Sequence, residues 1–234
     1  RKESYRAAGG TGMNCTAIIL AAGMSSRMKG TDKQLLSIDG IPVIVRSAMN
    51  FQNTSAVSEI IIAAKEELCA DIEVICKKAG VTKLKAVCAG GETRAKSAEA
   101  AFSLAGETEV TLIHDGARPF ASPEIITAVA EAAYENGGAI AAVPVTDTIK
   151  YVRDGFIEST PDRSALYGAQ TPQGFRTELY RKMLAQGGDF TDDSQLAEAM
   201  GIRVKIVTGS YDNIKITTPE DIARAEIIAK KEDI

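Results

Sequence analysis

Apolar runs and helix-spaced apolar positions alternate along this chain of 234 residues. Short continuous apolar runs are typical of strands buried on both faces of a sheet, and they predict strands at 16–22, 57–64, 84–87, 110–113, 139–143 and 203–208. Amphipathic patterns between these runs predict helices at 42–51, 66–78, 93–105, 123–135, 176–186, 192–200 and 219–230. The alternation predicts an α/β fold, a mostly parallel twisted sheet with helices on both faces. Ligands of such sheets bind at the carboxyl ends of the strands.

The segment 147–175 interrupts this alternation. It is polar, and Asp154-Gly155 between two β-like runs predicts a hairpin. A polar excursion with little core of its own commonly packs on something else, such as a second subunit. The chain therefore reads as a single domain over 13–234, with a protruding β-arm at about 147–172. Residues 1–12 lack the apolar core of a signal peptide and are predicted to be an expression-tag remnant ahead of Met13.

Composition restricts the function classes. The formal net charge of −4 argues against a nucleic-acid partner, and no apolar run approaches the ~20 residues of a membrane span. The four cysteines form no CxxC pair, which argues against zinc and favours reduced thiols in the cytoplasm. His114 is the single histidine, so any catalysis by imidazole must use it.

The loop after the first strand carries Arg27, Lys29 and Lys33 among small residues. Small residues let main-chain N–H groups approach an anion, and Arg27 and Lys33 add charge-assisted donors, so a triphosphate fits this loop. The loop matches neither the Walker pattern nor GxGxxG. A solvated turn is the alternative.

Three further segments carry candidate chemistry, each with a structural alternative. Gly90 and Gly91 end a strand, where a planar base could lie against the backbone, or they form a plain tight turn. Asp115 ends another strand. Its carboxylate is either a ligand for Mg²⁺ beside phosphates or a structural partner of Arg118. Lys215 lies in the strand-like run NIKIT, either solvated or reaching the phosphates from another strand of the sheet.

From about Cys15 to its C-terminus, the chain resembles the 2-C-methyl-D-erythritol 4-phosphate cytidylyltransferase family. The resemblance is carried, in order, by LAAG…RM…KQ, GG..R..S, HDGARPF, PVTDTIK, R..L..AQTPQGF, TDD and NIKITTPED. It implies a Rossmann-like nucleotidyltransferase sheet whose protruding β-arm forms a homodimer. It also implies the reaction of CTP with 2-C-methyl-D-erythritol 4-phosphate, giving 4-diphosphocytidyl-2-C-methyl-D-erythritol and pyrophosphate in non-mevalonate isoprenoid biosynthesis.

The resemblance further implies a role for each matching residue. The triphosphate and the transition state would be held by Arg27, Lys33 and Lys215. The cytidine pocket would be lined by Ala21, Ala22, Gly23, Gly90 and Ser97, with Asp115 at the ribose or metal. The sugar phosphate would be bound by Thr148, Arg163 and Thr171, with Arg163 reaching the partner subunit's site. Mg²⁺, or another divalent cation, would be held chiefly by the nucleotide phosphates, with Asp115 as the candidate protein ligand.

Two positions depart from the family's usual residues: Ser25 replaces glycine, and Asp32 replaces the proline before Lys33. The negative charge of Asp32 is expected to weaken the hold of Lys33 on phosphate. A phosphomonoester dianion is already a nucleophile at neutral pH, so the mechanism needs no general base and relies on positioning and electrostatics. The alternatives are a sister cytidylyltransferase for another polyol phosphate, such as ribitol 5-phosphate, and a non-catalytic nucleotide-binding module.

Overall fold

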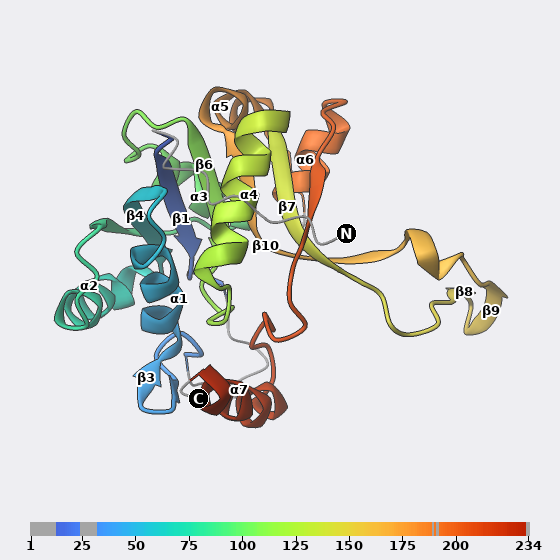
Figure 1. The fold of residues 1–234 in the computed structure, drawn as a ribbon, viewed down its shortest axis with the longest axis horizontal. Helices are drawn as coiled ribbons and strands as arrows, with labels where there is room; N and C mark the ends of the chain where they lie inside the picture. The colour runs from blue at the N-terminus through green and yellow to red at the C-terminus, as the bar shows by residue number, and fades with distance from the viewer. Residues whose placement is uncertain (1–12, 24–31, 189, 191, 233–234) are drawn as a thin grey trace, which may run out of the picture.

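The computed structural model describes residues 13–23, 32–188, 190 and 192–232, and its centre is a twisted sheet (Figure 1). The seven strands of this sheet in the described chain lie in the order β11-β7-β10-β6-β1-β4-β5. Their bounds are β1 Cys15–Leu20, β4 Val57–Ala64, β5 Leu84–Ala89, β6 Val110–Asp115, β7 Gly138–Pro144, β10 Tyr167–Arg176 and β11 Lys205–Thr208. All neighbouring strands pair in parallel except β10, which runs antiparallel to β6 and β7. The predicted mostly parallel sheet is confirmed.

Helices cover both faces of the sheet, as predicted. Helices α1 (Val43–Gln52), α2 (Cys69–Lys78) and α4 (Pro123–Asn136) share one apolar cluster with the sheet, which includes Phe51, Ile72 and Val129. The other face packs against α3 (Arg94–Phe102), α5 (Thr177–Gln186) and α6 (Asp193–Ala199). The predicted helix at 66–78 begins as a short 3₁₀ turn, η2 (Glu66–Leu68).

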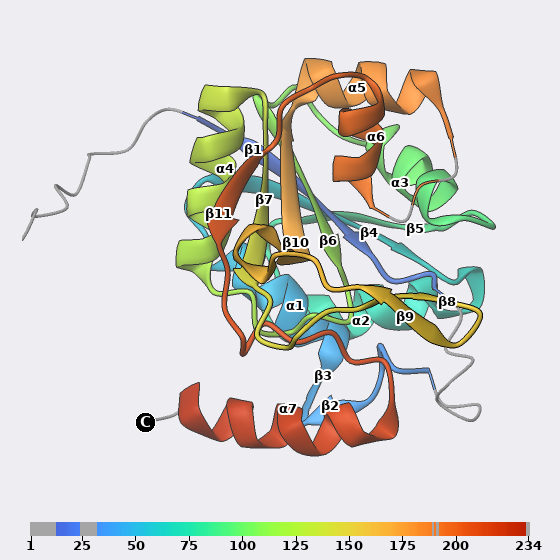
Figure 2. The same ribbon diagram turned by 90° about the vertical axis from the view of Figure 1, so that its right-hand side faces the viewer.

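Helix α7 (Pro219–Glu232) packs at one end of the sheet against the short hairpin β2 (Ser37–Ile38) and β3 (Ile41–Pro42), as Figure 2 shows. Their apolar contact includes Ile38, Ile216 and Ile228. This small apolar cluster holds in place the segment before β2 and the segment before α7. Those segments contain Lys33 and Lys215.

The predicted hairpin is confirmed as β8 (Tyr151–Arg153) and β9 (Phe156–Ser159). Its turn residues Asp154 and Gly155 both adopt positive φ, at 51° and 82°, the geometry that favours Asp-Gly in two-residue hairpin turns. The hairpin lies at the tip of an extension that leaves the body of the molecule (Figure 1).

The end of the 147–175 segment differs from its sequence interpretation. Residues 167–175, read as part of a polar excursion, belong to β10, which lies between β6 and β7 with residues 170–175 buried. The run at 213–217 is also not a strand, although Ile216 N–H donates to the carbonyl of Ala117 at 2.8 Å. Lys215 therefore approaches the sheet from an extended loop rather than from a strand.

Candidate active site

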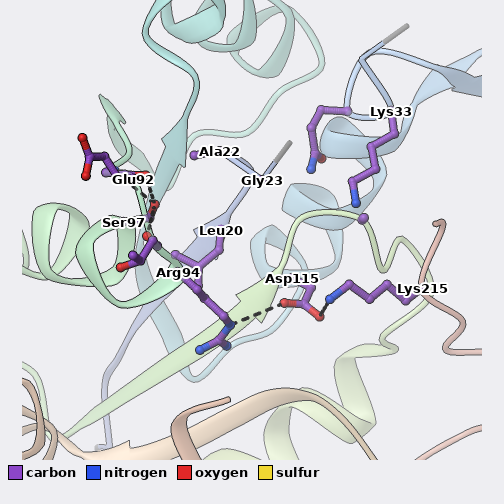
Figure 3. Close-up of a pocket in the computed structure, with 13 residues that line it drawn as sticks. Leu20, Ala22, Gly23, Lys33, Glu92, Arg94, Ser97, Asp115 and Lys215 are labelled. Carbon is purple, nitrogen blue, oxygen red and sulfur yellow. Dashed lines mark hydrogen bonds and ion pairs between the residues drawn. The ribbon is translucent and has the colours of Figure 1, made fainter. Parts of the chain in front are cut away.

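A cavity of about 540 Å³ opens at the carboxyl ends of the parallel strands (Figure 3). Its wall combines the end of β1, the β5–α3 loop, the end of β6, the turn after residue 31 and the loop before α7. The described residues that line it are Leu20, Ala22, Gly23, Lys33, Gln34, Gly91, Glu92, Thr93, Arg94, Ser97, Asp115, Ala117 and Lys215. The location is the one expected for a ligand site in a sheet of this kind.

The β5–α3 loop lies tightly against the end of β1. A Cβ on Gly90 would come within 2.4 Å of the Ala22 Cβ and 2.8 Å of the Ser97 Oγ, so only glycine fits without a shift. Ser97 Oγ accepts the Gly91 N–H at 3.1 Å and lies 3.0 Å from the Thr93 carbonyl, to which it donates. Thr93 caps α3 by accepting the Lys96 N–H at 3.1 Å. Close packing and capping together give this wall of the cavity a fixed shape.

Asp115 is the electrostatic centre of the site. Among the described residues, its carboxylate faces Lys215 at 2.9 Å, Arg118 at 3.4 Å and Arg94 at 4.0 Å. Burial alone would raise the pKa of Asp115, but Lys215, Arg94 and Arg118 together hold it well below its usual value. The carboxylate is therefore ionised at neutral pH and holds the cations at the cavity wall.

Lys33 and Lys215 reach the cavity from separate loops (Figure 3). The Lys215 side chain is 42% exposed, so its ammonium can meet a ligand while it remains paired with Asp115. Arg27, the third residue predicted to hold the triphosphate, lies outside the described residues, as does Ser25. Ala21 is buried, does not line the cavity and donates its N–H to the Ala63 carbonyl, whereas Ala22 and Gly23 line the cavity.

A smaller cavity of about 150 Å³ adjoins the first and shares Arg94, Asp115 and Lys215 with it. Thr171 lines this second space from β10. Its hydroxyl oxygen accepts the Asp115 N–H at 3.0 Å, and its hydrogen is left to donate to His114 Nδ1 at 2.9 Å. The structure thus brings Thr171 to the main chain of Asp115, whose carboxylate pairs with Lys215.

His114 is fully buried and fixed on both ring nitrogens. Because the Arg118 carbonyl can only accept, Nε2 carries the hydrogen and donates to it at 2.9 Å, and Nδ1 therefore accepts from the Thr171 hydroxyl. Burial lowers the pKa of His114 to about 4, so the ring is neutral at physiological pH. Its geometry orients neighbouring groups and offers no free nitrogen to a substrate.

The arm residues lie apart from this cluster within one chain. Thr148 is exposed, and exposed Arg163 donates to the carbonyl of Thr146 on the arm itself. Neither residue lines the two cavities just described. A single described chain therefore does not bring Thr148 and Arg163 to Asp115.

Sequence reasoning did not assign a role to Arg94. Its guanidinium pairs with Asp193, which begins α6, and Asp193 also accepts the Tyr180 hydroxyl at 2.9 Å. Gln173 Oε1 accepts the main-chain N–H groups of Asp193 and Ser194, at 3.0 and 3.1 Å. The arginine of GG..R..S and the second aspartate of TDD were the available signals, but only the fold pairs them.

Among the residues that the structure describes, no group of three or more histidine, cysteine, aspartate or glutamate side chains could hold a metal ion. No helix in the described ranges has the length and apolar character needed to cross a membrane. The four cysteines are free thiols.

The family model described as 2-C-methyl-D-erythritol 4-phosphate cytidylyltransferase matches residues 15–231. The enzyme of that name from Caldanaerobacter subterraneus subsp. tengcongensis is 44% identical over 229 residues, covering 94% of this chain and 100% of the relative. The one from Alkaliphilus metalliredigens is 42% identical over 217 residues, covering 88% and 89%.

Solved structures agree with these sequence matches. The 4-diphosphocytidyl-2C-methyl-D-erythritol synthase of Anaerococcus prevotii superposes with a TM-score of 0.83 at 31% identity, covering 93% of this chain and 96% of that one. The 2-C-methyl-D-erythritol 4-phosphate cytidylyltransferase of Thermus thermophilus gives a TM-score of 0.76 at 29% identity, covering 93% and 100%.

Proposed function

The chain belongs to the 2-C-methyl-D-erythritol 4-phosphate cytidylyltransferase family, and we propose that it carries out the family's reaction at the two adjoining cavities around Asp115. The enzyme is a nucleotidyltransferase of isoprenoid biosynthesis. It transfers the cytidylyl group of CTP to 2-C-methyl-D-erythritol 4-phosphate and releases pyrophosphate. The observation that carries the site assignment is the meeting of Lys33, Lys215 and the Gly90–Ser97 loop at one cavity.

The reaction forms one bond and breaks one bond at the α-phosphorus of CTP. A phosphate oxygen of the methylerythritol phosphate attacks that phosphorus, and the bond to the β-phosphate oxygen breaks as pyrophosphate leaves. Negative charge concentrates on the transferring group and on the leaving group. Lys33, Lys215 and Arg27 are proposed to stabilise it, in a site where their charges act more strongly than in bulk water.

No residue is needed to remove a proton from the nucleophile, because the phosphate dianion is already ionised. The buried, doubly hydrogen-bonded His114 supports this scheme, since it has no free nitrogen for a substrate. Asp115 holds Lys215 at the junction of the two cavities and leaves part of its ammonium exposed to the phosphates. The protein's contribution is positioning and electrostatics.

The larger cavity is proposed to take the nucleotide. Its wall of Ala22, Gly23 and Ser97, closed behind by Ala21 and Gly90, is proposed to face the cytidine. Asp115 would lie near the ribose. The smaller cavity, with Thr171 on its wall, is proposed to take the sugar phosphate.

Mg²⁺, or another divalent cation, is proposed to be bound chiefly by the nucleotide phosphates. The surroundings of Asp115 support this proposal. Lys215, Arg118 and Arg94 surround its carboxylate, so a metal ion would compete with three cations for a single protein ligand. The bound cation would offset phosphate charge. Activity should therefore vanish when a chelator removes divalent ions and return when Mg²⁺ is restored.

We propose that the arm joins two copies of the chain into a homodimer and that residues 13–234 form one domain bearing this arm between β7 and β10. Tyr151, Val152, Phe156 and Ile157 expose 58, 60, 79 and 65% of their surface on the hairpin, so no part of the chain that the structure describes covers these apolar side chains. A partner's arm would bring Thr148 and Arg163 to the sugar-phosphate cavity. The free thiols and the acidic net charge support a cytoplasmic enzyme that acts on small molecules rather than on nucleic acid or membranes.

A pyrophosphate-release assay tests the function directly. CTP with 2-C-methyl-D-erythritol 4-phosphate should give turnover, whereas CTP with ribitol 5-phosphate should give little. The reverse preference would identify the sister polyol phosphate as the substrate. CTP binding without turnover on either compound would favour a non-catalytic nucleotide-binding module.

A further inference from the structure

Asp32 begins the described turn that carries Lys33, and Lys65, the residue after β4, holds its carboxylate. The Lys65 Nζ lies 2.7 Å from Asp32 Oδ2, with the two side chains 27% and 12% exposed. Asp32 Oδ1 accepts the Gln34 N–H at 3.0 Å, and its main-chain oxygen accepts the Leu35 N–H at 3.2 Å. The carboxylate therefore ties this turn to the carboxyl edge of the sheet.

The Lys65 ammonium is the main compensation for the charge of Asp32. Asp32 Oδ2 is buried and has no hydrogen-bond partner among the described residues, where Lys65 is the cation that pairs with it. Loss of one member of a largely buried pair leaves the other member without its counter-charge, which destabilises the charged form. Without Lys65, a buried carboxylate would stand one residue from Lys33 and compete with phosphate for its ammonium.

This pairing changes the expectation from the sequence, in which the charge of Asp32 weakens Lys33. We propose that Lys65 is a positioning residue for nucleotide binding: it neutralises Asp32 and anchors the 32–36 turn, so that Lys33 acts on the triphosphate. The inference rests on the proposed role of Lys33. It assigns to Lys65 and Asp32 together the task of fixing this turn.

The test is Lys65→Met, which keeps the length of the side chain and removes its charge. CTP affinity, measured by calorimetry with Mg²⁺, should fall roughly tenfold, the loss expected from one charge-assisted contact. The KM for CTP should rise in parallel, while the KM for the sugar phosphate stays unchanged. Adding Asp32→Asn to Lys65→Met should restore most of the affinity, because the amide removes the charge and keeps an oxygen for the Gln34 N–H.

Lys85→Met is the matched control. Lys85 on β5 pairs with Glu59 on β4 at the same distance of 2.7 Å, but neither residue lines the cavity. This variant should bind CTP like the wild type. Wild-type affinity in Lys65→Met would overturn the proposal, as would a double variant as weak as Lys65→Met alone. Because calorimetry needs no turnover, a wild type that binds CTP but lacks cytidylyl transfer would refute the proposed function separately.

Discussion

The substitution Lys215→Ala is expected to lower the catalytic rate far more than the stability of the fold. Its ammonium touches Asp115 at 2.9 Å, yet the side chain is 42% exposed and belongs to none of the apolar clusters in the described chain. If Lys215 acts on the charge that develops at the α-phosphorus, kcat should fall by about 10²–10³, or about 2.7–4 kcal/mol, as for loss of one preorganised donor.

The expected cost in stability is much smaller. Asp115 keeps Arg118 at 3.4 Å and Arg94 at 4.0 Å, so its charge is not left alone when Lys215 is removed. A half-exposed ion pair is worth at most about 1 kcal/mol, which corresponds to a fall in Tm of roughly 2–4 °C for a chain of this size. The stability loss thus stays well below the catalytic loss.

The assay is pyrophosphate release with both substrates saturating, together with thermal unfolding of the same preparation. Lys205→Ala, at an exposed lysine on β11, serves as the control and should match the wild type in both measurements. A Lys215→Ala enzyme that is folded and retains near-wild-type kcat would refute a contact between Lys215 and the transition state. A collapse of Tm would instead assign Lys215 a structural role.

Three further predictions follow from the site and the arm. Arg163→Ala should raise the KM for the sugar phosphate at least tenfold, from loss of a charged contact worth about 1.5–3 kcal/mol, and leave that for CTP unchanged; equal rises would indicate a folding or dimer defect. Burial lowers the pKa of His114 from 6.5 in the unfolded chain to about 4 in the folded one, so the unfolded chain is protonated first as the pH falls. The free energy of unfolding should therefore decrease by about 3 kcal/mol as the pH is lowered from 6.5 to 4. Denaturant unfolding of the wild type and of His114→Asn should show that slope in the wild type only. Gly90→Ala should weaken CTP binding and cost about 1–3 kcal/mol of stability, because its Cβ would lie 2.4 Å from that of Ala22; unchanged unfolding would contradict this overpacking.

The sequence predicted best the elements whose burial is visible in their own residues. Strand β1 and its parallel neighbours are continuous apolar runs, and Asp154-Gly155 specifies a hairpin turn through its own conformational preferences. These properties are local, so a pattern of apolar and polar positions reveals them. The motifs also located the loops that form the cavity.

Strand β10 could not be predicted in this way, because distant partners compensate its buried polar residues. Thr171 is paired with His114, and Gln173 accepts the N–H groups that begin α6. Gln170 donates to the Ser210 carbonyl at 2.8 Å. From the sequence, these polar side chains are expected to face solvent, because their hydrogen-bond partners lie far away along the chain. The pairing of Asp32 with Lys65 was hidden for the same reason.

The reversed direction of β10 explains how the arm and the cavity come to lie at the same edge. The chain leaves β7 at Pro144, traverses the arm, and returns at Tyr167, which pairs with Pro144. Because β7 runs parallel to its neighbour β11 and points to the ligand edge, an antiparallel return must begin there. The register between β7 and β10 shifts between Ala169 and Gln173, the stretch that contains Thr171. A parallel return would have carried the chain to the opposite edge before pairing. One antiparallel strand therefore delivers Thr171 to Asp115 and anchors the arm beside the cavity, at the edge where we propose that the arm of a second copy completes the sugar-phosphate site.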